Sequence, residues 1–318
     1  MTDLGAISVR AASVDDEPGI LAVLSEAFDR PLSDEWFAWK HREGPWGPSR
    51  GWVAVADDEV VGVRLFVPWM LATPTGPVAI GRAMDGAVAP KAQRRGIFSR
   101  LVQAEMEYQQ VDPTWPVLYS TSVPASRDAY LKAGWSVFSV AGEMGPLRPG
   151  RRAAAGLDWD ILGDDTVARD VAPATPSGRP IAATAWTVEA LRWRTDPRSG
   201  HDYRSVRLAD SDHPHGAIVR RTSSQGLATL VVVHAWGPTA EQAAVVDAAG
   251  RALGARAWLR IAPPAGTPRR GWGRLARRRD VSTVSVWSAA PDPTTAIGFD
   301  PLTAGGWAFS HADLEGTM

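Results

Sequence analysis

Hydrophobic and polar positions in the first 140 residues switch repeatedly between the period of a strand and the period of a helix. Apolar residues recur at helical spacing in 13–28, where Ser13 is a candidate N-cap and acidic residues fill the first turn. Two apolar runs flank the acidic residues 57–59, a pattern that predicts a hairpin. Further strands are expected at 6–10, 78–88, 116–122 and 135–140, and further helices at 33–43, from the end of the strand 78–88 to about residue 110, and at 126–134. This order predicts a mixed α/β fold with a strand–helix–strand crossover in its middle.

The second half of the chain repeats part of this pattern. Residues 37–64 and 191–220 share a Trp followed by a basic residue, a turn rich in Pro and Gly, and a strand that ends in Ala-Asp. A strand at 227–236, a helix at 239–254 and a strand at 255–262 follow. Because the composition changes to Pro, Gly and Arg over 145–156, we expect two domains, 1–146 and 147–318, that arose by duplication.

A polar turn that contains a glycine stands between the strand 78–88 and the next helix. Gln93, Arg94 and Arg95 precede Gly96 there, whereas only Gly-Pro-Thr joins the corresponding strand and helix of the second half. A helix N-terminus exposes unpaired backbone amides, and a glycine lets an anion approach them closely. The two arginines can add direct charge. On spacing alone, an anion site and an ordinary tight turn both remain open.

Composition narrows the classes of function. Lys and Arg total 34 against 35 Asp and Glu, so the net charge of −1 gives no global attraction to nucleic acid or to an anionic membrane. The sequence has no cysteine, which excludes disulfides, thiolate zinc sites and a cysteine nucleophile. The N-terminus lacks the pattern of a signal peptide, and no apolar run approaches the roughly 20 residues of a membrane span. We expect a soluble cytoplasmic protein.

Two further features are candidates for binding. The segment 269–279 is a basic cluster interleaved with Trp and Gly, which is either a solvated surface loop or a nucleic-acid contact. His213 and His215 flank a proline, but the six histidines show no spacing typical of metal ligands, and no metal is expected.

The segment from Val88 to Phe98 resembles the acyl-CoA motif of the GNAT superfamily of N-acetyltransferases. In that motif a strand ending in Val-x-Pro leads into Gln/Arg-x-x-Gly-x-Gly/Ala and a long helix. Val88-Ala89-Pro90 and Gln93-Arg94-Arg95-Gly96-Ile97-Phe98 stand at these positions, with Phe98 in place of the small residue. Residues 126–135 are similar to the Tyr-x-Lys-x-Gly-Phe/Trp segment of the same superfamily. The resemblance covers residues 7 to about 140, and the second half looks like a degenerate copy.

The resemblance implies a GNAT acyl-CoA N-acyltransferase fold, a mixed α/β sheet in two tandem domains, with acetyl-CoA or another acyl-CoA held between two splayed parallel strands. Its pantetheine would pair with main chain at the end of the strand, and its pyrophosphate would rest on the amides of the turn. Since Val123 replaces the family's usual Asn, a hydroxyl of Thr121, Ser122 or Ser126 would take that role. The residues expected to bind acyl-CoA are Ala87, Val88, Ala89, Gln93, Arg94, Arg95, Gly96, Ile97, Phe98, Ser99 and Ser126.

Two side chains are the expected catalytic residues. Tyr130 stands where the family has its thiolate-facing tyrosine and is expected to protonate the leaving thiolate; the alternative is an aromatic residue that only packs. Asp85 is the first candidate for the base, because strand alternation places it on a face of small residues with Ala83 and Ala87, where burial could raise its pKa. A bulge at Gly86 would invert that alternation, and Arg82 could instead be a structural partner of Asp85. Glu35, His41 and Glu43 are further candidates for the base.

The expected function is therefore acetyl-CoA-dependent N-acetyl transfer to a primary amine of a small molecule or peptide, with a catalytically silent second half. Two alternatives remain open: a non-catalytic acyl-CoA-binding or regulatory module, and a nucleic-acid-binding protein acting through 269–279. The sequence does not indicate the acceptor, the acyl chain length or the oligomeric state.

Overall fold

The computed structural model describes residues 5–147, 156–164, 181–224, 226–264, 272 and 276–314. The chain divides into two compact units. The first comprises Met1–Phe138 and Thr283–Gly306, and the second comprises Ser139–Ser282 and Trp307–Met318. Each unit therefore takes a segment from the other half of the chain, whereas the sequence analysis expected a single boundary near residue 146.

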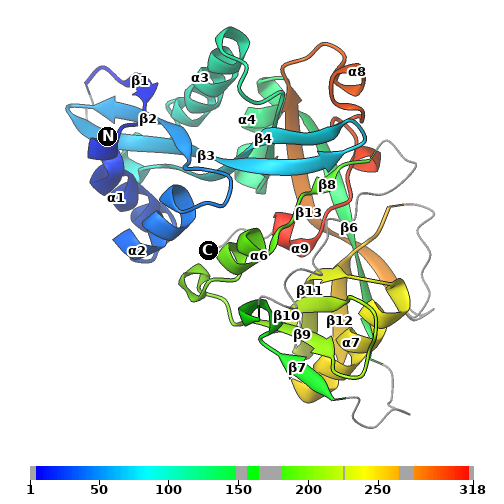
Figure 1. Ribbon diagram of the computed structural model, residues 1–318. Helices are drawn as coiled ribbons and strands as arrows, with labels where there is room; N and C mark the ends of the chain where they lie inside the picture. The colour runs from blue at the N-terminus through cyan, green and yellow to red at the C-terminus, as the bar shows by residue number, and fades with distance from the viewer. Residues whose placement is uncertain are drawn as a thin grey trace. The chain divides into compact units, whose positions relative to one another are not determined.

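The first unit is built on a mixed sheet with the strand order β1-β2-β3-β4-β5-β13. Neighbouring strands are antiparallel except β4 and β5, which are parallel and are joined by helix α3 (Figure 1). The hairpin between β2 and β3 turns at Asp57 and Asp58, which both have the positive φ that a two-residue hairpin turn favours. The strands are β1 (Ser8–Ala11), β2 (Arg50–Ala56), β3 (Glu59–Thr73), β4 (Gly76–Val88), β5 (Val117–Thr121) and β13 (Arg277–Ser288).

Helices cover both faces of this sheet. Figure 1 shows α1 (Glu17–Ala27) and α2 (Asp34–Phe37) on one face, and α3 (Ile97–Val111) and α4 (Pro124–Lys132) on the other. The hydroxyl of Ser33 caps α2 by accepting from the Trp36 amide, and the helix continues as a π-helical turn, Ala38–Arg42. A short helix α8 (Pro293–Ile297) and the 3-10 turns Val14–Asp16, Pro90–Ala92 and Ala304–Gly306 complete the unit. The predicted α/β order is confirmed.

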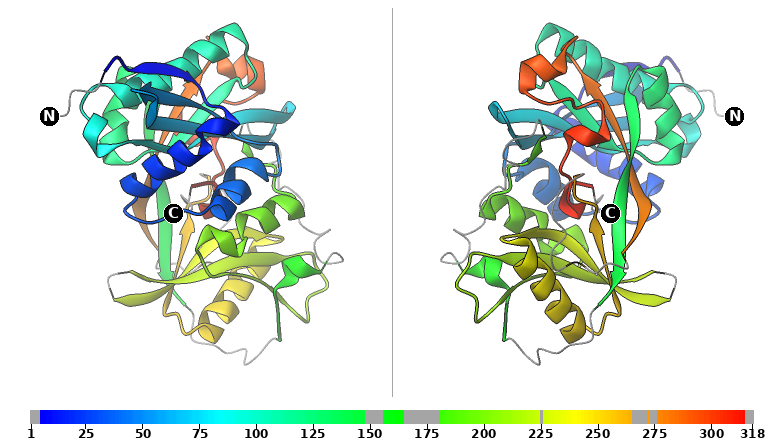
Figure 2. Two further views of the ribbon diagram at one scale, coloured as in Figure 1. Left: turned by 90° about the vertical axis from the view of Figure 1, so that its left-hand side faces the viewer. Right: turned by 90° about the vertical axis from the view of Figure 1, so that its right-hand side faces the viewer.

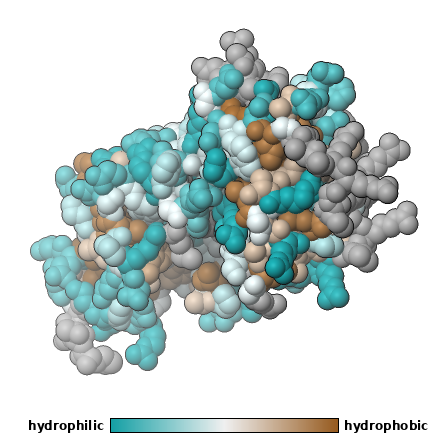
Figure 3. Space-filling model, turned by 90° about the horizontal axis from the view of Figure 1, so that it is seen from below, coloured by the Kyte–Doolittle hydropathy of each residue, from teal (hydrophilic) through white to brown (hydrophobic). Residues whose placement is uncertain are grey.

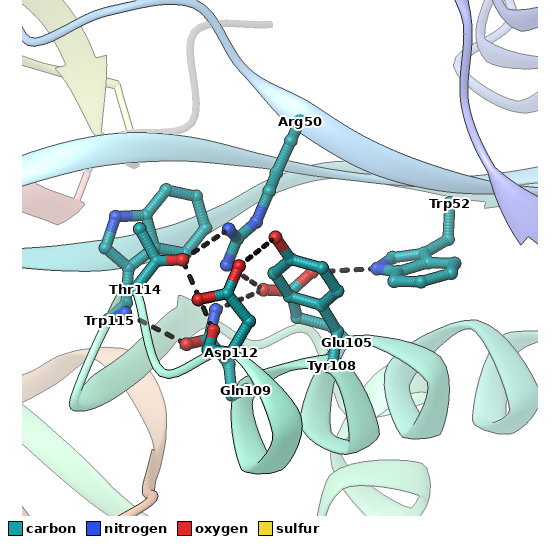
Figure 4. A network of polar contacts seen from close by, with 8 residues as sticks. All are labelled: Arg50, Trp52, Glu105, Tyr108, Gln109, Asp112, Thr114 and Trp115. Atoms are coloured by element: carbon teal, nitrogen blue, oxygen red, sulfur yellow. Dashed lines mark hydrogen bonds and ion pairs between the residues drawn. The ribbon is translucent and has the colours of Figure 1, made fainter.

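A buried polar network fixes the C-terminal part of α3 to β2 (Figure 4). The Glu105 carboxylate is fully buried and accepts from Arg50 Nη2 at 2.7 Å, Trp52 Nε1 at 2.7 Å and Gln109 Nε2 at 2.8 Å. Gln109 in turn accepts from the Trp115 amide at 2.9 Å. Burial raises the pKa of Glu105 more than these hydrogen bonds lower it. The network therefore holds one end of α3, while its N-terminus faces the loop after β4.

In the second unit the strands follow the order β7-β9-β10-β11-β12-β6. Only β11 and β12 are parallel among these described strands, and helix α7 joins them. In both views of Figure 2, α7 (yellow) lies against one face of the sheet. These strands are β6 (Ser136–Pro146), β7 (Leu157–Trp159), β9 (Tyr203–Leu208), β10 (Gly216–Ser224), β11 (Leu227–Trp236) and β12 (Ala257–Ile261), and the short strand β8 (Ala183–Thr184) lies outside this order. The helices are α6 (Val188–Arg194), α7 (Thr239–Ala252) and α9 (His311–Leu314), with 3-10 turns at Ile161–Gly163 and Pro197–Ser199.

The two units share one topology. Each has three antiparallel pairings, a parallel crossover through one helix, and a final antiparallel strand contributed by the other half of the chain. In the first unit that strand is residues 284–288 of β13 beside β5, and in the second it is residues 142–146 of β6 beside β12. The repeat expected from the sequence is therefore present as a repeat of strand order.

The surface is largely hydrophilic on the face shown in Figure 3, where apolar residues lie in small groups between polar ones. Within the described ranges, no helix combines the length and the apolar character that crossing a membrane requires.

Candidate functional site

The parallel strands β4 and β5 part from each other within the first unit. They pair at Gly81–Leu118, Arg82–Tyr119 and Ala83–Ser120, and the pairing ends there. Beyond Ala83, β4 continues to Val88 and remains paired with β3 on its other edge, whereas β5 ends at Thr121. The edge of β4 from residue 84 onward is thereby available to a ligand that can hydrogen-bond to main chain. We call this place the fork.

A β-bulge on β4 lies at the fork. Arg64 of β3 pairs with Gly86 and the next residue, Leu65, pairs with Met84, so Asp85 has no partner across the ladder and adopts a φ of +22°. The bulge reverses the alternation of the strand. Ala83 packs in the core under α3 and α4, but Asp85 turns toward the face covered by α2. The expectation that Asp85 shares a face with Ala83 is wrong, and the alternative of a bulge holds, one residue before Gly86.

Asp85 forms a buried ion pair. Lys40 Nζ lies 2.7 Å from Asp85 Oδ2 and 2.9 Å from Oδ1, and His41 Nε2 lies 2.9 Å from Oδ2. Burial acts to raise the pKa of Asp85, but the charge of Lys40 and the hydrogen bond from His41 outweigh it and hold that pKa well below its usual range. The expectation of a raised pKa for Asp85 is therefore wrong. The partners of Asp85 are Lys40 and His41, and not Arg82, which the sequence analysis considered.

His41 links this pair to a serine. Burial lowers the pKa of His41 and the neighbouring carboxylate opposes that effect only in part, so the ring is neutral near pH 7. With Nε2–H donating to Asp85, Nδ1 is left to accept from the Ser49 hydroxyl, 2.9 Å away. The result is a hydrogen-bonded chain from Ser49 through His41 to Asp85.

The sequence analysis gave His41 only as a further candidate for the base, and it did not identify Lys40 or Ser49. Neighbouring residues do not share a face of an α-helix, so the adjacency of Lys40 and His41 gave no signal. The π-helical turn lets both reach Asp85. The other two further candidates for the base, Glu35 and Glu43, are exposed.

Tyr130 lies on the opposite face of the fork. Its side chain is 1% exposed, and its hydroxyl accepts a hydrogen bond from Arg64 Nη2 and donates to Ser120 Oγ at 3.2 Å. Arg64 also donates to Ser120 Oγ and to the carbonyl oxygen of Met84, both at 3.0 Å. These bonds place the phenol hydroxyl where β4 and β5 part. Sequence reasoning missed Arg64 and Ser120, although an Arg inside the apolar run 60–71 was a signal.

The loop after β4 is open at the N-terminus of α3. Gly96 has a φ of +71°, and, its chain neighbours aside, no atom of the described residues comes within 4 Å of the position that a Cβ would occupy. Arg94 also has a positive φ, and the residues from Gln93 to Gly96 are exposed. Helix geometry leaves the first amides of α3, those of Ile97, Phe98 and Ser99, without intrahelical acceptors. These donors and the adjacent arginines suit a phosphate group.

The side chains of the remaining expected residues are occupied within the protein. Ile97 is buried in the core, and the Phe98 ring packs edge-on to Tyr130 with centroids 5.8 Å apart. Gln93 Nε2 donates to the Val88 carbonyl at 3.1 Å, which ties the loop to the end of β4. The Ser126 hydroxyl donates to the Val123 carbonyl at 3.1 Å. Ala87 and Val88 pair with β3, and the Ala89 amide donates to Val61.

The second unit has a buried polar cluster of its own, in which the Asp313 carboxylate accepts from the Thr184 hydroxyl and from the amide and hydroxyl of Ser310. His215 donates from Nδ1 to the His213 carbonyl at 2.7 Å and accepts the Leu208 amide at Nε2 at 2.9 Å, a purely structural arrangement. Within the described ranges, no three His, Asp or Glu side chains group as metal ligands would. Most of the basic cluster 269–279 lies outside the described residues; Trp272, which is described, packs against Trp258 with ring centroids 4.9 Å apart.

Comparisons with known proteins agree with this geometry. Residues 8–138 match the family model of the acetyltransferase (GNAT) domain. Solved structures with a similar fold include a GCN5-related N-acetyltransferase from Anabaena variabilis, with 13% identity, a TM-score of 0.68, and coverage of 90% of this chain and 73% of that one. A protein from Enterococcus faecalis described as a probable N-acyltransferase has 12% identity, a TM-score of 0.67 and coverage of 89% and 72%. A GCN5-related N-acetyltransferase from Kribbella flavida has 17% identity, a TM-score of 0.60 and coverage of 88% and 71%. No curated protein matches the chain in sequence.

Proposed function

Because residues 8–138 belong to the GNAT acetyltransferase family, we propose that this chain transfers an acyl group from acyl-CoA, with acetyl-CoA as the donor, to an amine of a small molecule or peptide. The observation that carries the proposal is the parting of β4 and β5 directly before the open N-terminus of α3. An extended ligand with amide groups and a diphosphate can use both features at once.

The main chain at the fork fits such a ligand. The amides of Ile97, Phe98 and Ser99 and the charges of Arg94 and Arg95 would hold the diphosphate, and Gly96 leaves the approach clear. The open edge of β4 at Ala87, Val88 and Ala89 would pair with the amides of pantetheine. Ser126 would contribute a hydroxyl only after releasing Val123. Bound acyl-CoA supplies a thioester carbonyl that an amine can attack.

The Ser49–His41–Asp85 chain supports the removal of the amine proton. His41 is neutral and can accept a proton at Nδ1 through the Ser49 hydroxyl, while the ionised Asp85 stabilises the resulting imidazolium. We assign the base to His41 and a positioning role to Asp85, because a carboxylate with a lowered pKa next to Lys40 is a weak base.

Tyr130 supports protonation of the departing sulfur. Its hydroxyl already donates to one neutral acceptor, Ser120 Oγ, and lies at the fork where the thioester is expected. The second unit, whose topology repeats the first, is proposed to be a degenerate copy without catalytic activity.

Calorimetry with coenzyme A tests the proposal. The wild-type protein should bind CoA, and Gly96→Ala should weaken binding about tenfold or more, which is about 1.4 kcal/mol, because its Cβ enters the diphosphate approach. Gly254→Ala is the matched control: Gly254 also has a positive φ and open space around it, but it follows α7 in the second unit. It should carry a similar backbone strain and leave CoA binding unchanged.

Two results would contradict the proposal. Absence of CoA binding to the wild-type protein would remove the acyl-CoA assignment. CoA binding without turnover of acetyl-CoA across a panel of amines would instead support the non-catalytic module.

A further inference from the structure

Arg64 is a buried guanidinium whose hydrogen bonds all go to neutral oxygens. It is 5% exposed and donates to the Met84 carbonyl and to the hydroxyls of Ser120 and Tyr130. Its Nε is buried and has no acceptor within the described residues. Buried charges are normally paired with an opposite charge. Arg260 in the second unit shows the ordinary case, since it lies 2.9 Å from the Glu143 carboxylate.

The position of this charge is specific. Arg64 pairs with Gly86 across the ladder, and its side chain crosses that glycine toward β5. A Cβ on Gly86 would lie 2.7 Å from Arg64 Nη1 and 3.2 Å from the Phe98 ring, so the path exists only because residue 86 has no side chain. The guanidinium thus bridges Met84 of β4, which follows the last pair, and Ser120 of β5, which belongs to it.

The surroundings keep this charge out of water. The rings of Phe66 and Phe98 each lie 5.6 Å from the Arg64 guanidinium carbon. In an environment of low polarity, a fixed positive charge stabilises an anion far more than it does in water. An anion placed at the fork would supply the opposite charge that the described residues do not provide.

We propose that Arg64 stabilises the negative charge that forms on sulfur when the acyl group is transferred. The inference rests on the proposed function. The amine lone pair forms the new C–N bond while the C–S bond breaks and its electron pair stays on sulfur. The amine proton leaves through Ser49 to His41 and then to solvent. Sulfur departs as a thiolate that Arg64 stabilises, and Tyr130, to which Arg64 already donates, passes it a hydroxyl proton as the product leaves. Solvent returns a proton to Tyr130, so the protein ends the turnover with the protons it began with.

The ionisation of the CoA thiol provides a test that does not depend on activity. A positive charge within about 4–6 Å lowers the pKa of an acid by about 1–3 units, and an ordinary thiol titrates near about 8.5. At about pH 7.5, binding of CoA should therefore release up to one proton, measured by calorimetry in buffers of different ionisation enthalpy. Desulfo-CoA, which has no thiol, should bind with no release attributable to sulfur.

Substitutions assign the effect to Arg64. Arg64→Met should still bind CoA but lose the proton release, whereas Arg64→Lys should retain part of it. Arg82→Met is the matched control, because Arg82 is also buried on this sheet but lies over the Trp69 ring at 4.4 Å; it should retain the full release. Thermal unfolding checks that each variant is folded, and if Arg64→Met is not, the wild-type and Arg64→Lys titrations decide.

The outcomes separate the two proposals. Tight CoA binding by the wild-type protein without proton release, or equal release by Arg64→Met, overturns the role of Arg64 and leaves the proposed function intact. Failure of the wild-type protein to bind CoA or desulfo-CoA removes both.

Discussion

The two units of this protein have the same fork and different chemistry within it. In the second unit Ile218 pairs with His234 and the next residue, Val219, pairs with Val232, so Val233 is bulged as Asp85 is in the first. The parallel strands β11 and β12 also pair at three positions, ending at Val231–Leu259. Strand order, bulge and crossover are therefore properties of the shared topology and do not by themselves make a site.

A few residues account for the difference. By register, the positions of Arg64, Asp85 and Ser120 are taken in the second unit by Ile218, Val233 and Leu259, which are all buried and apolar. These three positions are thus polar in one unit and apolar in the other. The loop differs as well: α7 begins directly after Gly237 and Pro238, and the polar turn 93–96 that precedes α3 has no counterpart there.

The largest expected effect on activity comes from removing the phenol hydroxyl of Tyr130 in the first unit. Tyr130→Phe should lower kcat about 10²–10³-fold with CoA affinity nearly unchanged, since general-acid catalysis contributes about 10²–10⁴-fold. Tyr119→Phe is the control, because Tyr119 is equally buried on β5 but is not bonded to Arg64 or Ser120 in the described contacts. Equal activity of the two variants in a steady-state assay would place the proton donor elsewhere.

The helices that cross over the two forks should differ in how they respond to truncation. The residues that α3 buries include Glu105 and Gln109, whereas those that α7 buries are apolar. Glu105→Ala leaves Arg50 without its buried carboxylate and should cost about 3–5 kcal/mol in the free energy of unfolding.

Glu105→Gln should lower the free energy of unfolding less than Glu105→Ala does, and it should remove the dependence of stability on pH that comes from Glu105. The pKa of Glu105 is raised in the folded state. Its contribution to the free energy of unfolding is therefore complete below the pKa of the unfolded chain, and it is lost as the pH rises through the pKa of the folded state. Urea unfolding at several pH values measures both variants. Equal destabilisation by Ala and Gln at all pH values would show that the charge of Glu105 is immaterial.

The hydrogen-bonded residues Ser49, His41 and Asp85 should determine how kcat falls at acidic pH. His41 acts in its neutral form and its pKa is lowered, so kcat should fall only below about pH 6.5 as the ring becomes protonated. Asp85→Asn should reduce kcat about 10–100-fold and shift this limb, because the imidazolium loses its carboxylate. A pH profile of Asp85→Asn with the same limb as the wild type would assign the proton acceptor to another group.

The smallest effect is expected in the second unit, where His234 stands at the position of Gly86. Desolvation lowers the pKa of His234 to about 4, while Asp313 opposes the shift. The folded state therefore binds fewer protons than the unfolded chain, and stability should fall as the pH decreases from about 6.5 toward 4, by roughly 1–2 kcal/mol given partial exposure. Thermal unfolding of wild type and His234→Phe over this range measures the difference; identical curves would show that His234 does not contribute.

Short stretches of sequence were sufficient to predict the helices, the strands and the loop before α3. The helical period of 97–111, the turn at Asp57 and Asp58 and the glycine before α3 all lie within short windows of sequence. The bulge at Asp85 was not predictable in position, because one extra residue reverses every later side chain without changing the hydrophobic pattern. Lys40 and Arg64 join the site through contacts with distant segments, and Ser49 joins it through His41, which lies 8 residues earlier in the chain.

The exchange of strands has a consequence for biosynthesis. Residues 284–288 cover one edge of β5 in the folded protein. During synthesis this edge has no partner until the ribosome has made the chain between β5 and residue 284. An uncovered strand edge invites pairing with other chains. The amino-terminal half should therefore be prone to aggregate when expressed as a fragment, and supplying the 283–306 peptide in trans should restore its solubility.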